Sequence, residues 1–168
     1  MEIDPGMMAS VAQDGFFAAL AALGFSCAAN PPVRAMLGAA VLGAVGHALR
    51  FAFVDEMGVN LPMATFLASL SIGLFGAFSA KLLRCPAELF SFPALLPMIP
   101  GMYAYKTVLA LMRFMLNEDA PAPVLNGFIV DIFRNGLTSL FVTFSLVVGA
   151  AVPLMLFRKV NYTRRRSG

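Results

Sequence analysis

Residues 92–101 of this chain read Phe92-Pro93-Ala94-Leu95-Leu96-Pro97-Met98-Ile99-Pro100-Gly101, which places three prolines and a glycine within nine residues of an apolar segment. Each proline lacks a backbone N–H and clashes with the carbonyl one turn earlier, so this stretch cannot form an ordinary helix. In hydrocarbon, a carbonyl that loses its partner must be satisfied by protein or by water in a cavity. The stretch therefore predicts a discontinuous helix beside a watery route. A simple proline kink in a subunit that only packs is the alternative.

The residues after this break suit a carboxylate. Pro100 is expected near the first turn of a second half-helix, where its missing N–H does no harm. The amide end of that half-helix would carry positive potential at about mid-membrane depth. Lys106 adds a formal positive charge and Tyr105 a hydroxyl about one turn further along. Discontinuous helices with binding sites near the bilayer midplane recur in secondary transporters.

The composition of the whole chain indicates a membrane protein. Of its 168 residues, 60% are hydrophobic and 12% are charged, about half the charged share of a typical soluble domain. The net charge of +3 does not predict a nucleic-acid partner, because the chain lacks a soluble module with a basic surface. Five basic residues gather instead in a tail placed to contact anionic lipid. They are Arg158, Lys159, Arg164, Arg165 and Arg166.

We predict an all-α fold, a polytopic membrane protein of about five transmembrane helices with a proline-broken fourth helix. A span needs about 20 mostly apolar residues. As one helix, residues 124–157 would be about 50 Å long, so the first turns are expected at or beyond the membrane interface. The predicted spans, within a single transmembrane domain over residues 1–168, are 8–29, 33–54, 61–82, 89–116 and 133–157, followed by a basic cytoplasmic tail, 158–168.

Charges in the loops predict the orientation. Arg34 lies in the first loop, Lys81 and Arg84 flank the third, and the tail is basic. The N-terminus and the second and fourth loops are acidic instead. Because Lys and Arg favour the cytoplasmic side, we expect the N-terminus outside and the C-terminus in the cytoplasm.

Three ionisable residues inside the predicted spans are candidates for proton coupling or for a gate. Asp14 lies in the first span, and His47 and Arg50 share one face of the second at i, i+3 spacing. Ionisable side chains in a span usually face a cavity or another helix. A carboxylate beside a histidine suits proton exchange near neutral pH. An interhelical polar clamp is the structural alternative.

Two hydroxyls of the third span, on Thr65 and Ser69, are candidates for lining a pathway. Such hydroxyls more often bond back to their own helix. The glycines and alanines around them, and around His47, indicate close helix packing.

No cofactor, metal site or enzyme activity is expected. Cys27 and Cys85 form no CxxC pair, and the single histidine has no partner at metal-ligand spacing. The spans contain no nucleophile–base pair and no paired carboxylates.

A set of short motifs occurs in order along about the first two-thirds of the chain and resembles the threonine/serine exporter family, in its small-subunit branch. That branch corresponds to the C-terminal membrane half of the one-chain exporters. The fifth span matches only in hydrophobic character, and it leaves the roles of Asp131 and Arg134 open. The motifs are Ala12-Gln13-Asp14, Pro32-Val33-Arg34-Ala35, Gly43-Ala44-Val45-Gly46-His47-Ala48-Leu49-Arg50, Thr65-Phe66-Leu67-Ala68-Ser69 and Pro97-Met98-Ile99-Pro100-Gly101 with Ala104-Tyr105.

The resemblance implies a proton-driven secondary exporter of threonine, serine or a dicarboxylate such as succinate in the bacterial cytoplasmic (inner) membrane. It also implies a larger membrane subunit as partner and leaves room for a higher oligomer. Two five-span halves would lie inverted relative to each other, a symmetry that supports alternating access. A non-transporting assembly subunit is the alternative. The predicted solute site comprises Thr65, Ser69, Pro97, Pro100, Gly101, Tyr105 and Lys106, with Asp14, His47 and Arg50 as coupling or gate residues.

Overall fold

The computed structural model describes residues 5–157, and within this range it contains helices and no strand. Four helices are long and apolar enough to cross a membrane, and a bent pair, Glu88–Met98 with Gly101–Leu116, would make a fifth. The predicted fold class, a polytopic all-α membrane protein, is therefore confirmed. The helices are α1 (Pro5–Ala28), α2 (Val33–Asp55), α3 (Leu61–Leu83), α4 (Glu88–Leu95), the 3₁₀ turn η1 (Leu96–Met98), α5 (Gly101–Leu116) and α6 (Ala122–Leu156).

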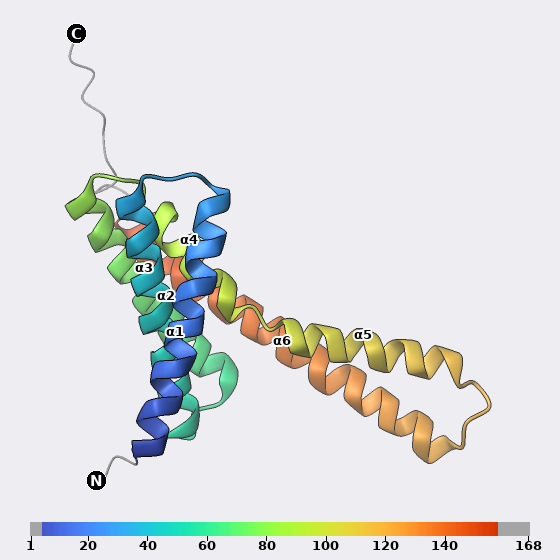
Figure 1. The fold of residues 1–168 in the computed structure, drawn as a ribbon. Helices are drawn as coiled ribbons and strands as arrows, with labels where there is room; N and C mark the ends of the chain where they lie inside the picture. The colour runs from blue at the N-terminus through green and yellow to red at the C-terminus, as the bar shows by residue number, and fades with distance from the viewer. Residues whose placement is uncertain (1–4, 158–168) are drawn as a thin grey trace.

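Helices α1, α2 and α3 form an up-and-down bundle, and the short α4 packs against all three (Figure 1). Helix α5 and residues 122–140 of α6 leave this bundle as a helical hairpin, which we call the α5–α6 arm (Figure 1). The rest of α6 returns to pack against α3. The arm is thus anchored to the bundle chiefly through one long helix.

The end of α6 runs in the same direction as α3. Ser69 Oγ donates to the carbonyl of Ser145 at 3.2 Å, and further along both helices Lys81 and Phe157 line one cavity. Helix α1 starts beside the other end of α2, so the chain enters and leaves the bundle at opposite ends (Figure 1). This arrangement suits an odd number of membrane passes.

Local signals in the sequence explain where the long helices end. Asn30 adopts a positive φ of 46° after α1, and Pro31 and Pro32 follow it. Asn60 caps α3 by accepting a hydrogen bond from the Met63 amide at 3.0 Å. Arg84 closes α3 in the left-handed conformation, with a φ of 54°.

The contact between α3 and α6 depends on glycines. A Cβ on Gly149 would lie 2.7 Å from the Phe66 carbonyl oxygen, and one on Gly73 would lie 2.7 Å from the Ala150 carbonyl oxygen. Backbone atoms cannot move aside as a flexible side chain can. Close approach of helices through small residues is a usual way to pack them in a membrane.

Substituting Gly149→Ala should therefore destabilise the protein by about 1–3 kcal/mol, the usual range for an overpacked contact. The matched control is Gly127→Ala, which is in the same helix but has open space where the Cβ would lie. Thermal unfolding of both purified proteins in detergent measures the difference. Equal melting temperatures would contradict this description of the α3–α6 contact.

The predicted break in the fourth segment is present, but it begins later than its first proline. Helix α4 continues past Pro93, tightens to the 3₁₀ turn η1 at Pro97, and then turns extended at Ile99. Helix α5 begins at Gly101 with Pro100 as its N-cap, and the two halves meet at 45°. The break places the start of α5 beside the bundle and aims the rest of α5 into the arm.

Candidate functional site

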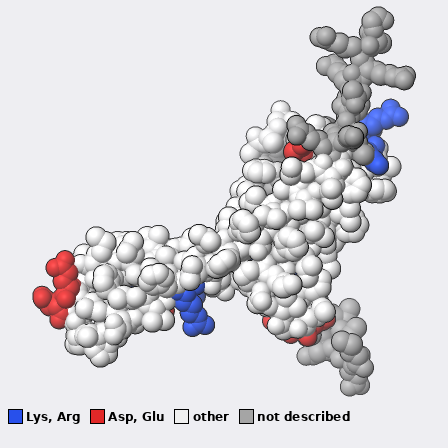
Figure 2. Space-filling view, turned by 180° about the vertical axis from the view of Figure 1, so that it is seen from behind, with Lys and Arg blue, Asp and Glu red and all other residues white. Residues whose placement is uncertain are grey.

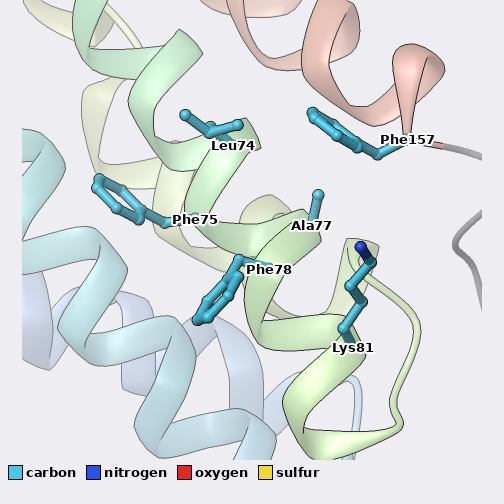
Figure 3. A pocket seen from close by; sticks show the side chains of 6 residues that line it. All are labelled: Leu74, Phe75, Ala77, Phe78, Lys81 and Phe157. Atoms are coloured by element: carbon cyan, nitrogen blue, oxygen red, sulfur yellow. The ribbon is translucent and has the colours of Figure 1, made fainter.

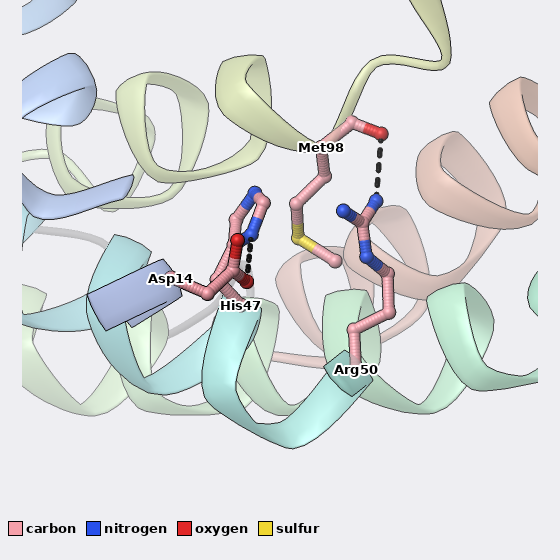
Figure 4. A network of polar contacts seen from close by, with 4 residues as sticks. All are labelled: Asp14, His47, Arg50 and Met98. Atoms are coloured by element: carbon pink, nitrogen blue, oxygen red, sulfur yellow. Dashed lines mark hydrogen bonds and ion pairs between the residues drawn. The ribbon is translucent and has the colours of Figure 1, made fainter. Parts of the chain in front are cut away.

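Arg50 of α2 reaches the broken segment. Its Nη1 donates a hydrogen bond of 3.1 Å to the carbonyl oxygen of Met98, the last residue of η1 (Figure 4). This carbonyl lies where the helix stops, so the following turn cannot supply an amide to it. A hydrogen bond from a charged donor is about twice as strong as a neutral one. Arg50 therefore satisfies a carbonyl that the break leaves open.

Asp14 and His47 form a hydrogen-bonded pair one helical turn from Arg50. His47 Nδ1 lies 2.9 Å from Asp14 Oδ2, which joins α1 to α2 (Figure 4). The His47 side chain is 9% exposed and that of Asp14 is 41% exposed, so the carboxylate is the more accessible partner. The other ring nitrogen, Nε2, is buried without a hydrogen-bond partner among the described residues.

Together, the three residues form a polar group beside the break. In the tautomer in which His47 Nδ1 donates to Asp14, Nε2 carries a free lone pair. The geometry thus brings together the three residues predicted for coupling or gating, and links them to the break.

The hydroxyls of Thr65 and Ser69 lie elsewhere and are already engaged. Both residues are fully buried in α3. Thr65 Oγ1 donates to the Leu61 carbonyl at 2.7 Å, and Ser69 Oγ lies within bonding distance of the carbonyls of Phe66 and Ser145. In this conformation the two hydroxyls bond to helix backbone, and their role toward a solute stays a prediction.

The predicted residues at the break differ in exposure. Pro100 is buried and Pro97 half-buried, whereas Gly101, Tyr105 and Lys106 are exposed. A Cβ added at position 101 would meet no atom within 4 Å. The start of α5 is therefore an open position next to the Arg50 contact.

Between α5 and α6 lies a polar cavity of about 490 Å³ that contains Lys106. Three basic side chains and one carboxylate line it, and the space-filling view shows basic side chains on the arm apart from the acidic group at its tip (Figure 2). Tyr105 is not among the lining residues, which are Tyr103, Lys106, Leu109, Ala110, Arg113, Phe128, Asp131, Arg134 and Asn135.

Sequence reasoning missed this cavity, although a signal for it exists. Tyr103, Lys106, Ala110 and Arg113 recur every three or four residues, so they share one face of α5. The same spacing relates Phe128, Asp131 and Arg134 on α6. That these two faces meet depends on the hairpin turn between the helices, which the spacing alone does not predict.

A second cavity, of about 390 Å³, lies between α3 and the end of α6. Its lining is almost wholly apolar except for Lys81 at one edge (Figure 3). Such a surface suits an acyl chain or an apolar side chain better than a hydrophilic solute. Among the described residues, no group of three or more His, Cys, Asp or Glu is placed to hold a metal ion.

Comparison with known proteins gives one family. The family model described as threonine/serine exporter matches residues 14–156, which include the break, the three charged residues beside it and the α5–α6 arm. No solved structure matches the chain.

Proposed function

The chain belongs to the threonine/serine exporter family, which makes it a membrane exporter, and we propose that it carries small carboxylate-bearing solutes past the break between η1 and α5. The solutes are threonine- and serine-type amino acids or a dicarboxylate such as succinate. The driving force is the proton gradient. Membership of this family favours a transporter over an enzyme.

One observation supports this proposal most strongly, the hydrogen bond from Arg50 to the Met98 carbonyl. A polar backbone within a membrane-spanning region survives where protein or water satisfies it. Arg50 satisfies one carbonyl, and the exposed Gly101 opens the start of α5 on the same side of the break. The amide end of α5 supplies positive potential for a carboxylate there.

The Asp14–His47 pair supplies a proton-binding group for coupling. His47 Nε2 is one of three buried side-chain atoms without a hydrogen-bond partner among the described residues, and His47 lies one turn from Arg50. A gradient that drives protons inward can power export only by exchange, so proton and solute bind in alternation. The exporter carries the solute outward with this pair deprotonated, and it returns without solute once a proton has bound.

We further propose that the chain is the small subunit of a two-subunit exporter in a bacterial inner membrane, with its N-terminus outside. The α5–α6 arm supports a partner, because α5 packs mainly against α6 and presents large apolar side chains on its other faces. A larger membrane subunit of the same family would cover part of them, and lipid the rest. Larger assemblies built from such pairs remain compatible with this arrangement.

The second candidate function is a non-transporting assembly subunit, in which the polar contacts only hold helices together. The engaged hydroxyls of Thr65 and Ser69 favour this role for α3. It predicts that a change such as His47→Ala lowers the stability of the complex, whereas the exporter predicts that it lowers flux at constant protein level.

Solute counterflow tests the proposed function. The chain is purified from membranes of its own host, so that any partner subunit is retained, and reconstituted into vesicles preloaded with unlabelled threonine, serine or succinate. We expect at least one preload to accelerate uptake of the same labelled solute, while threoninol and succinamide, the analogues without a carboxylate, do not. Vesicles with correctly inserted protein but no acceleration by any carboxylate would exclude the proposal.

A further inference from the structure

We infer that the cavity between α5 and α6 is a second anion-binding site, which holds the carboxylate group of a solute that has passed the break. The inference rests on the proposed function for the identity of its solute. It adds a separate site on the arm. Lys106, Arg113 and Arg134 supply its positive charge, and the Asp131 carboxylate competes with a solute carboxylate for these three cations. Lys106 is also a predicted residue of the solute site at the break, whereas neither the sequence motifs nor the family match assigns a role to Arg113, Asp131 or Arg134.

The first argument is the imbalance of charge. Three basic side chains face one carboxylate in a cavity of about 490 Å³. In the described part of the chain, Asp131 forms no salt bridge with any of them, since the sole acidic–basic contact of this kind there is Asp14–His47. All four charged residues are exposed, so the excess of positive charge faces the open space of the cavity. A small anion in the cavity would relieve this excess of positive charge.

The second argument is the polarity of the arm. Its other faces carry exposed apolar side chains, such as Val108 and Met112 on α5 and Val130 and Phe133 on α6, which suit lipid or a partner helix. The charged side chains converge on the cavity instead. Charged groups of a membrane protein usually face a water-filled space in this way.

The third argument is position. Tyr103, at one end of the cavity, lies two residues after Gly101, where α5 begins at the break. Arg113, at the other end, is ten residues further along, about 15 Å at 1.5 Å per residue. The cavity therefore extends from the break toward the turn between α5 and α6, so a carboxylate that leaves the start of α5 meets it next.

Asp131 gives this site a distinctive property. Its carboxylate occupies the same cavity as the three cations and competes with a solute carboxylate for them. Neutralising Asp131 should therefore strengthen anion binding, whereas neutralising Arg113 or Arg134 should weaken it. A purely structural role for these residues predicts no such opposite signs.

Cysteine labelling tests the inference without relying on transport. In a background of Cys27→Ser and Cys85→Ser, Asn135→Cys places a thiol in the cavity, and Asn126→Cys places one on an exposed part of α6 outside it. Both are reacted, in unsealed membrane fragments, with an anionic and a cationic thiosulfonate of similar size. A focused positive field raises the local anion concentration by about tenfold or more. We expect the ratio of anionic to cationic rates to be higher by about that factor at position 135 than at position 126.

Charge variants and added solutes then show whether the cavity attracts anions. Asp131→Asn should raise the rate ratio at position 135, and Arg134→Gln or Arg113→Gln should lower it severalfold. Succinate should slow the labelling, and succinamide should not. Should Asn135→Cys be unreactive, as when a partner's carboxylate fills the cavity, Phe128→Cys is tested in its place. Unreactive thiols at both positions, or equal rate ratios at positions 135 and 126, would overturn the inference.

The two proposals fail separately. Counterflow with no charge preference in the labelling would leave the exporter function intact and remove this second site. Charge-selective labelling with protection by succinate, but without counterflow, would keep the site and remove the transport function.

Discussion

Arg50→Met should lower export severalfold or more while leaving the protein in the membrane. Methionine keeps much of the apolar length of arginine but removes the donor to the Met98 carbonyl. A buried carbonyl without a partner costs about 1–3 kcal/mol, which shifts a conformational equilibrium by about fivefold to 150-fold. The chain can avoid this penalty by rearranging η1 and closing the break. Export measured in cells or vesicles should then fall by about fivefold or more.

The matched control for this change is Arg34→Met. Arg34 lies in the same helix, but it is exposed near the start of α2 and far in sequence from the break. It should leave export near the wild-type rate. Arg50→Lys should give an intermediate rate, because lysine retains a charge and a donor but lacks the planar guanidinium. Wild-type export by Arg50→Met would show that the Met98 carbonyl needs no partner from α2.

His47→Gln should separate transport from its driving force. Glutamine can still donate a hydrogen bond toward Asp14, so the link between α1 and α2 survives. It cannot take up a proton in the physiological range, so the charge beside Arg50 no longer changes. We expect export driven by a pH gradient to fall by about fivefold or more, since a removed coupling of 1–3 kcal/mol is worth about 5- to 150-fold. Counterflow at equal pH should persist.

Asp14→Asn and the double variant complete the test. If the two side chains act as a unit, the double variant should be about as impaired as His47→Gln alone. Purified protein from each variant should melt near the wild-type temperature. A large loss of thermal stability with normal flux per folded molecule would instead favour the assembly subunit, in which the pair is a structural clamp.

The sequence predicts the break well because proline acts locally. Pro97 and Pro100 remove donors wherever the chain places them, so an interruption near residue 98 follows from covalent structure alone. The position of the first proline mattered less than expected. Pro93 lies in the second turn of α4, and the helix continues through it.

The hydrogen bond that satisfies the open carbonyl at the break could not be predicted from the sequence. Arg50 and Met98 are 48 residues apart, and the bond between them depends on how α4 and η1 pack against α2. Spacing indicated that His47 and Arg50 share a face, but it did not indicate that one faces Asp14 and the other the broken backbone. The cavity of the arm shows the same limit, because two ordinary stripes of polar residues become a site only after α5 and α6 pair.

The hydroxyls of Thr65 and Ser69 illustrate a different limit. A serine or threonine in a helix can line a route or bond to its own backbone, and the two uses have the same sequence. Here the local bonds to Leu61 and Phe66 are made. Whether either hydroxyl contacts a solute depends on other conformations of the exporter.

Modification of Gly101→Cys tests most directly the claim that solutes pass at the break. A Cβ there would meet no atom within 4 Å, so the variant should fold and keep measurable export before modification. We predict that a charged thiosulfonate then reacts at this position in a background without Cys27 and Cys85, that export stops, and that threonine, serine or succinate slows the reaction. A thiol at position 101 that no aqueous reagent reaches, or full export after complete modification, would contradict a solute route past the break.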